Sequence, residues 1–184
     1  MLSDTILKST QIPKNFDLLS IDVDGNDYHI WNTLKNYRPK VVIVEFNPTI
    51  PNEIEFIQNP DSKINHGNSI LSLCNLAKSK SYELIAATLN NAFFVDSKYF
   101  NLFEIQDNSV EKIREDKSRI TYVFSGYDGT LFIRGFGKID LHNIPIYESK
   151  IQQLPKFLRG WGDKNRLKIF LRRIYISLKK RKII

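Results

Sequence analysis

The run Lys40–Glu45 constrains the fold of this chain more than any other segment. It reads Lys-Val-Val-Ile-Val-Glu and follows Pro39. Four consecutive apolar β-branched or aliphatic residues favour an extended strand, and an unbroken apolar run is typical of a strand covered on both faces. A second apolar run, Phe16–Asp22, is closed by acids and Gly25. We expect it to form another buried strand.

The neighbouring segments alternate between helical and extended patterns. Residues 27–36 and 68–80 carry apolar side chains at helical spacing, and residues 48–66 between them are rich in Pro and Asn, which predicts a long loop. Tyr82–Thr88 and Ala92–Val95 have the pattern of two strands joined by a tight turn. The order strand, helix, strand, loop, helix, strand, strand indicates an α/β domain with a partly parallel sheet.

The C-terminal part has a different pattern. We expect a charged helix over residues 107–118, followed by a β-hairpin in which Ile120–Phe124 and Thr130–Ile133 flank the turn Gly126–Gly129. The sequence thus predicts three segments: a partial Rossmann-like domain at 1–100, an extension with a hairpin at 101–160, and a basic amphipathic tail at 161–184.

Acidic and amide side chains follow both of the first two predicted strands. Asp22 and Asp24 follow the first strand, and Glu45 and Asn47 end the second. If a right-handed crossover makes these strands neighbours, the oxygens converge at the edge where α/β sheets bind ligands. Such oxygens suit Mg²⁺, or they hold a substrate hydroxyl and take its proton. His66, in the loop that faces this edge, is a candidate base, although a solvent-exposed loop histidine is the commoner case.

An EF-hand interpretation of the acidic run is excluded. Counted from Asp22, that loop needs Gly at its sixth position and Glu at its twelfth, where this chain has Asp27 and Thr33. A purely structural alternative is a turn at Asp24 with Asp27 capping the next helix. It explains Glu45 poorly, because a glutamate at the end of a buried strand needs a partner.

Several blocks of sequence resemble the FkbM-like group of S-adenosylmethionine-dependent methyltransferases. They agree in order and spacing, and the resemblance covers about residues 3–158. The blocks are Asp17–Tyr28, Pro39–Asn47, Gly67–Leu73, Asn91–Val95, Tyr127–Thr130 and Gln153–Pro155.

This resemblance implies a fold and an activity. The fold is an incomplete Rossmann-like class I methyltransferase sheet with strand order 4-5-7-6, followed by the hairpin extension and the basic helix. In that numbering, Phe16–Asp22 is strand 4, Lys40–Glu45 strand 5, Tyr82–Thr88 strand 6 and Ala92–Val95 strand 7. The implied activity is O-methylation of a sugar or glycan hydroxyl.

The resemblance also implies roles for the site residues. Asp24, Glu45 and His66 would be catalytic, and Asp22 and Asp24 would contact S-adenosylmethionine. Related catechol O-methyltransferases bind a metal at the ends of strands 4 and 5, which maps onto Asp22 or Asp24 and onto Glu45 with Asn47, and we take Asp22, Glu45 and Asn47 as the expected ligands. This chain has Glu-Phe-Asn where those enzymes have adjacent Asp-Asn.

The glycine-rich turn that holds the cofactor in this family is expected upstream of Met1. None of the eight glycines forms Gly-x-Gly-x-Gly after a predicted strand, and Gly135 and Gly137 precede no predicted helix. Losing those contacts costs more than ~5 kcal/mol. We therefore expect a truncated chain that is inactive alone unless a second chain supplies the missing half. Its first strand then becomes an exposed sheet edge, prone to dimerisation and the weak point of the fold.

The C-terminal tail is strongly basic. From Lys164 onward there are nine Lys and Arg and no acid; since the whole chain carries +7, residues 1–163 carry −2. Five apolar residues fall on one helical face: Leu167, Phe170, Leu171, Ile174 and Leu178. We expect this helix at an anionic membrane surface or packed on the body. Nucleic acid is a weaker alternative, because the body is acidic and contains no recognition motif.

Cysteine and histidine usage point to the cytoplasm and away from zinc. Cys74 is the single cysteine and belongs to an apolar helical stripe, so we expect a core thiol and not a nucleophile. The three histidines are scattered, which makes a zinc site improbable. The sequence predicts a cytoplasmic protein, with peripheral membrane association as one of the two roles open to its tail.

Overall fold

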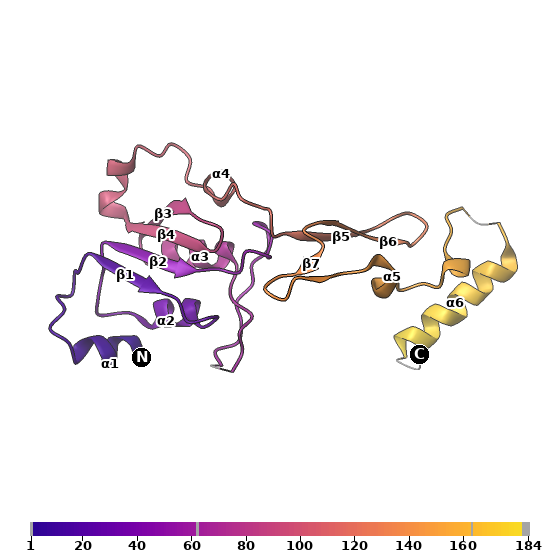
Figure 1. The fold of residues 1–184 in the computed structure, drawn as a ribbon, viewed down its shortest axis with the longest axis horizontal. Helices are drawn as coiled ribbons and strands as arrows, with labels where there is room; N and C mark the ends of the chain where they lie inside the picture. The colour runs from indigo at the N-terminus through magenta and orange to yellow at the C-terminus, as the bar shows by residue number, and fades with distance from the viewer. Residues whose placement is uncertain (1, 62, 163, 182–184) are drawn as a thin grey trace. The chain divides into compact units, whose positions relative to one another are not determined.

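The computed structural model describes residues 2–61, 63–162 and 164–181 and divides the chain into two compact units (Figure 1). The first unit is residues 1–120 and the second is residues 121–184. Segment boundaries at residues 100 and 160, expected from the sequence, stay predictions. Lys182, one of the nine basic tail residues, lies outside the described residues.

The first unit is an α/β structure with a mixed four-stranded sheet, which confirms the predicted fold class (Figure 1). The strand order is β1-β2-β4-β3; β1 is parallel to β2, and the other two pairings are antiparallel. Correspondence with strands 4, 5, 7 and 6 of a class I methyltransferase stays a prediction. In chain order the elements are α1 (Leu2–Lys8), β1 (Leu18–Ile21), α2 (Asp27–Thr33), β2 (Val41–Glu45), α3 (Ile70–Ser79), β3 (Tyr82–Ala87), β4 (Asn91–Asp96), the 3-10 helix η1 (Ser97–Phe103) and α4 (Val110–Ile113).

The core of this unit lies between the sheet and helices α2 and α3, which contact each other. Val42 and Val44 of β2 are fully buried, whereas Val41 and Ile43, which alternate with them, are partly exposed. Trp31 of α2 packs on this face, with its ring centroid 4.9 Å from that of Phe94 in β4. Burial along β2 therefore alternates, and the expectation of a strand covered on both faces is wrong.

Strand β1 is an outer strand of the sheet and not the buried strand expected from its composition. Among the described residues it pairs with β2 alone. Leu18 is 54% exposed, and only Ile21 at its end is fully buried. The backbone N–H groups of Lys40 and Val41 donate to the carbonyls of Phe16 and Asp17, which aligns β1 with β2 at their entry. The exposed edge predicted here is present.

The charged helix predicted over residues 107–118 is reduced to one turn, α4. Local side-chain hydrogen bonds lie on either side of it: Asp107 accepts one from the Ser109 N–H just before α4, and Asp116 accepts one from the Ser118 N–H beyond it. Arg114 follows α4 in an extended conformation and is buried. The predicted helix is shorter because the chain turns inward at Arg114, whose buried side chain makes tertiary hydrogen bonds to the loop that follows β2.

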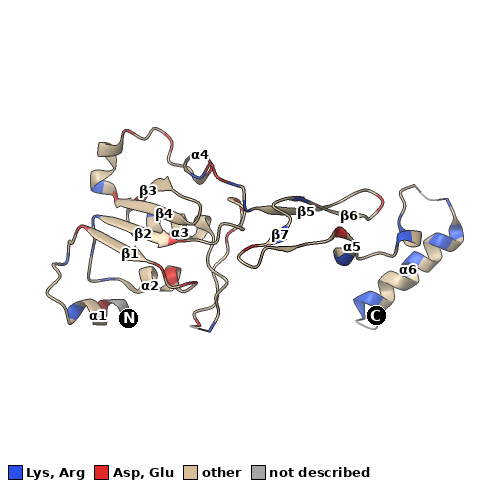
Figure 2. Ribbon diagram, in the orientation of Figure 1, with Lys and Arg blue, Asp and Glu red and all other residues tan. Residues whose placement is uncertain are grey.

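The second unit contains the predicted hairpin. Its strands β5 and β6 are antiparallel, and side-chain atoms of Glu148 and Gln152 accept hydrogen bonds from the backbone of β6 at Ile133 and Leu131. Its elements are β5 (Thr121–Ser125), β6 (Leu131–Gly135), β7 (Lys138–Ile139), β8 (Ile144–Pro145), α5 (Glu148–Ile151), the 3-10 helix η2 (Lys156–Leu158) and α6 (Arg166–Lys180). Lys and Arg positions recur along α6, and the helix contains no Asp or Glu (Figure 2).

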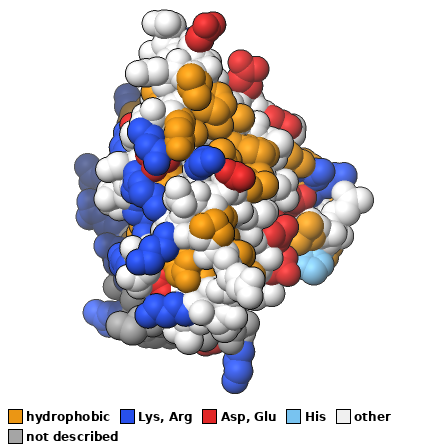
Figure 3. All heavy atoms as spheres, turned by 90° about the vertical axis from the view of Figure 1, so that its left-hand side faces the viewer, with side chains coloured by type: hydrophobic (Ala, Val, Ile, Leu, Met, Phe, Trp, Pro, Cys, Tyr) orange, Lys and Arg blue, Asp and Glu red, His pale blue; other side chains and the backbone are white. Residues whose placement is uncertain are grey.

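Apolar side chains also reach the surface of the molecule. On the face drawn in Figure 3, hydrophobic groups lie among charged groups of both signs.

In the described part of the chain, no helix combines the length and apolarity that crossing a bilayer requires.

Candidate carboxylate site

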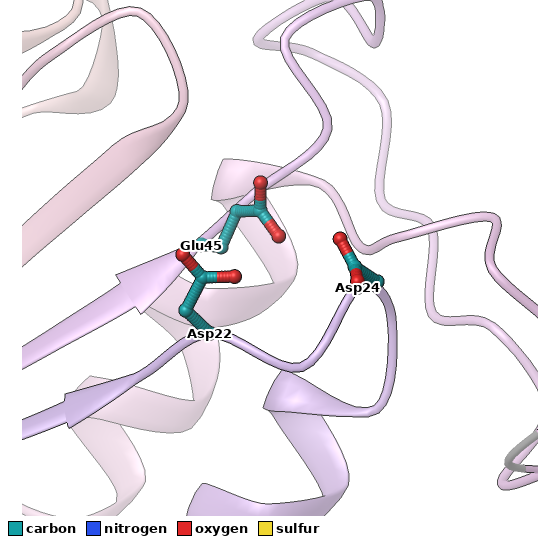
Figure 4. Close-up of side chains that lie close together, drawn as sticks. All are labelled: Asp22, Asp24 and Glu45. Atoms are coloured by element: carbon teal, nitrogen blue, oxygen red, sulfur yellow. The ribbon is translucent and has the colours of Figure 1, made fainter.

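Three carboxylates meet where β1 and β2 end (Figure 4). Asp22 follows β1, Glu45 is the last residue of β2, and Asp24 lies in the turn that leads to α2. Parallel pairing of Ile21 with Val44 sets the two strand ends side by side. One carboxylate oxygen from each residue lies within 4.8 Å of the others. The convergence of Asp22, Asp24 and Glu45 predicted from the sequence is confirmed.

The conformation of the turn after β1 places the Asp24 carboxylate near those of Asp22 and Glu45. Asp24 has a φ of +54° and Gly25 a φ of +144°, a conformation that only glycine adopts readily. The buried carboxylate of Asp27 accepts hydrogen bonds from the N–H groups of Val23 (3.1 Å) and Gly25 (2.9 Å). Asp27 is the first residue of α2 and follows the cap residue Asn26. Its side chain stabilises the turn through these two hydrogen bonds. The expectation that it caps the helix is wrong.

Two buried amides, which the sequence did not single out, tie this turn to the long loop. Asn68 donates from Nδ2 to the Gly25 carbonyl at 2.7 Å. Gln58 donates from Nε2 to Asn26 Oδ1, and its Oε1 accepts hydrogen bonds from the N–H groups of His66 and Gly67. These contacts hold the loop beside the carboxylates.

The environment of the cluster raises the pKa of Glu45 above its ordinary value. Burial, followed by the nearby charge of Asp22, raises the pKa of Glu45, against the hydrogen bond that it accepts from Asn90 Nδ2 at 3.2 Å. Burial also raises the pKa of Asp27 above its ordinary value. Both Asp22 and Asp24 are exposed, so a ligand in solvent can reach the cluster.

The other two predicted site residues are placed differently. Asn47 Oδ1 already accepts hydrogen bonds from the N–H and hydroxyl groups of Thr49, and its Nδ2 donates to the His66 carbonyl. The His66 side chain is exposed, and among the described residues it does not join the three carboxylates. A metal-ligand role for Asn47 and a catalytic role for His66 stay predictions.

Cys74 is buried in the core, as expected. Burial raises the pKa of its thiol to about 12, so at neutral pH it is a protonated packing group and not a nucleophile.

The cluster has the chemistry to bind a hard cation or to accept hydrogen bonds from hydroxyl groups. Three carboxylates at short range are the donors that a hard divalent cation prefers, and they also accept hydrogen bonds from hydroxyl groups. Among the described residues, Gly135 and Gly137 lie at the end of hairpin strand β6 and beyond it, with no following helix to bind a methionine group.

Comparison with known proteins identifies one family. Residues 2–74 match the family described as the methyltransferase FkbM domain, which confirms the resemblance over that segment. The match includes β1, β2 and all three carboxylates of the cluster. Neither the curated proteins nor the solved structures contain a significant match to the chain.

Proposed function

We propose, from the premise that residues 2–74 are related to FkbM methyltransferases, that this is a methyltransferase-like protein whose carboxylate cluster binds a sugar or glycan hydroxyl. The convergence of Asp22, Asp24 and Glu45 at the ends of β1 and β2 carries the proposal. Several acceptor oxygens at short range suit the neighbouring hydroxyls of a sugar, each of which donates one hydrogen bond.

In this proposal Glu45 is the base. A carboxylate whose pKa is raised by burial accepts a proton more readily than an ordinary glutamate does. The acceptor hydroxyl donates to Glu45 and transfers its proton there as its oxygen becomes the nucleophile. Asp22 and Asp24 position the adjoining hydroxyls and, being exposed, make the site reachable from solvent.

We further propose that the 184-residue chain does not transfer methyl groups by itself. Its sequence contains no glycine-rich turn between a strand and a helix to hold the methyl donor. In this proposal the segment that holds the methyl donor lies outside these 184 residues, and the edge of β1 that is unpaired among the described residues is where a further strand could be added.

Saturation-transfer NMR with a panel of methyl glycosides tests acceptor binding. We expect signals from the wild-type chain that weaken in Glu45→Gln and Asp24→Asn. Asp17→Asn is the matched control, because this exposed acid lies at the opposite end of β1 and pairs with Lys40. Equal signals from all four proteins would contradict the proposed site.

Isothermal titration with S-adenosylmethionine tests the cofactor part separately. We expect no binding at micromolar concentration. Micromolar affinity would show that the chain is competent to bind the methyl donor alone.

A metal role is the second candidate for the same cluster, with Asp22, Glu45 and Asn47 as ligands. Its support is that the carboxylates of Asp22 and Glu45 converge with that of Asp24, because hard cations prefer carboxylate oxygens. Calorimetric titration with Mg²⁺ distinguishes this role. Heat of binding that is lost in Asp22→Asn supports a metal site. If no heat of binding is observed, hydroxyl binding is the candidate that remains.

A further inference from the structure

Helix α6 exposes its apolar face. Leu167, Phe170, Leu171 and Ile174 lie on one side of the helix and are 65, 59, 42 and 41% exposed. Ordinary amphipathic helices bury this side, because removing apolar groups from water is the main source of their stability. The exposure of this apolar side over residues 167–174 is therefore unusual for an amphipathic helix and requires an explanation.

The helix contacts its own unit through its polar side instead. Arg172 donates from Nε to the Leu158 carbonyl at 2.8 Å. Lys179 donates from Nζ to the carbonyl and to Oε1 of Gln153, at 3.0 and 2.7 Å. Arg172 and Lys179 lie on the side of α6 opposite Ile174. The anchored polar side thus leaves the apolar side turned outward.

Cations border the exposed apolar face. Arg166 and Arg173 lie four residues before and three residues after Phe170, which makes them its neighbours on the helix surface. Both are exposed, and α6 contains no acidic residue (Figure 2). Long cationic side chains beside an apolar stripe can reach anionic groups while the stripe lies deeper.

Exposed aromatic rings occur in the same unit. Trp161 and Tyr127 are 76 and 86% exposed, and their ring centroids are 5.5 Å apart. Amphipathic rings of this kind are favoured at the boundary between water and lipid headgroups.

We propose that α6 lies in the surface of an anionic phospholipid bilayer. Leu167, Phe170, Leu171 and Ile174 insert below the headgroups, and Arg166 and Arg173 contact lipid phosphates. The combination of an outward apolar face and unopposed positive charge favours this occupant over nucleic acid, which has no use for the apolar stripe, and over a second α6, whose equal charge would repel it. This inference goes beyond the proposed methyltransferase function and does not depend on it.

Co-sedimentation of the full chain with phosphatidylcholine vesicles, with and without phosphatidylserine, tests the proposal. We expect binding to the phosphatidylserine vesicles that weakens as salt is added. The double variant Phe170→Gln/Leu171→Gln should bind roughly tenfold or more weakly, because it removes inserted apolar groups and keeps the charge. Arg166→Gln/Arg173→Gln should lose about fivefold per cation removed.

The matched control is Leu102→Gln/Phe103→Gln, which changes two exposed apolar residues of η1 and leaves α6 intact. It should bind like the wild type. Circular dichroism of each variant verifies that its helix content is unchanged. Absence of wild-type binding, an equal loss in the η1 control, or loss in the arginine variant alone would each overturn the proposal; the last result would mean adsorption by charge without insertion.

Discussion

At the scale of single residues, the buried Arg114 side chain holds the start of the long loop through three hydrogen bonds. It is 1% exposed and donates to the carbonyls of Pro48 (2.6 Å) and Ile50 (2.8 Å) and to Asn52 Oδ1 (2.9 Å). We expect Arg114→Met to lower the free energy of unfolding by about 3 kcal/mol, because these acceptors lose their partner. Urea titration measures it. Lys112→Met, an exposed change on α4, should cost under ~0.5 kcal/mol; similar losses in both variants would contradict this account.

Residue types and their positions were sufficient to find the three acids of the site, but not their supports. Asp22, Asp24 and Glu45 follow predicted strands, and topology alone then brings them together. Gln58 and Asn68 are ordinary polar residues in and after a loop, with no periodicity to mark them. Their importance arises from burial, which depends on where the loop lies in three dimensions.

At the scale of elements, β1 is the least protected strand of the sheet. Among the described residues one of its edges is unpaired, and Leu18 and Ser20 are exposed. We expect its amides to exchange hydrogen faster than those of β3, the other outer strand, because α3, α4 and η1 contact β3. Native-state hydrogen exchange followed by NMR measures this difference. Equal protection of the two outer strands would contradict it.

Elements with strong hydrophobic patterns were predictable, and those decided by tertiary contacts were not. Strand β2, helix α3 and the β5–β6 hairpin were each identified from apolar runs or turn residues. The helix expected over residues 107–118 is reduced to Val110–Ile113, because Arg114 leaves the helical conformation and makes buried hydrogen bonds to the long loop. Whether β1 was buried depended on its neighbours, which composition does not specify.

At the scale of the whole molecule, the two tryptophans report on different units. Trp31 is buried in the core of the first unit, and Trp161 is exposed in the second. We expect Trp161→Phe to keep most of the fluorescence change on unfolding, because a ring already in water changes its environment little. Fluorescence-detected urea titration of both proteins tests this. Loss of more than half of the amplitude would show that Trp161 is shielded in the folded protein.

The proposed site requires Asp22 and Glu45 to lie side by side, and ¹³C NMR titration of the Glu45 carboxyl tests this most directly. We expect a pKa above the ordinary glutamate value, because burial and the Asp22 charge both disfavour the ionised form. Asp22→Asn removes the charge and keeps the shape, so the pKa of Glu45 should fall, whereas the control Asp17→Asn should leave it unchanged. A Glu45 pKa that is ordinary, or that does not respond to Asp22→Asn, would contradict the convergence of the two strand ends.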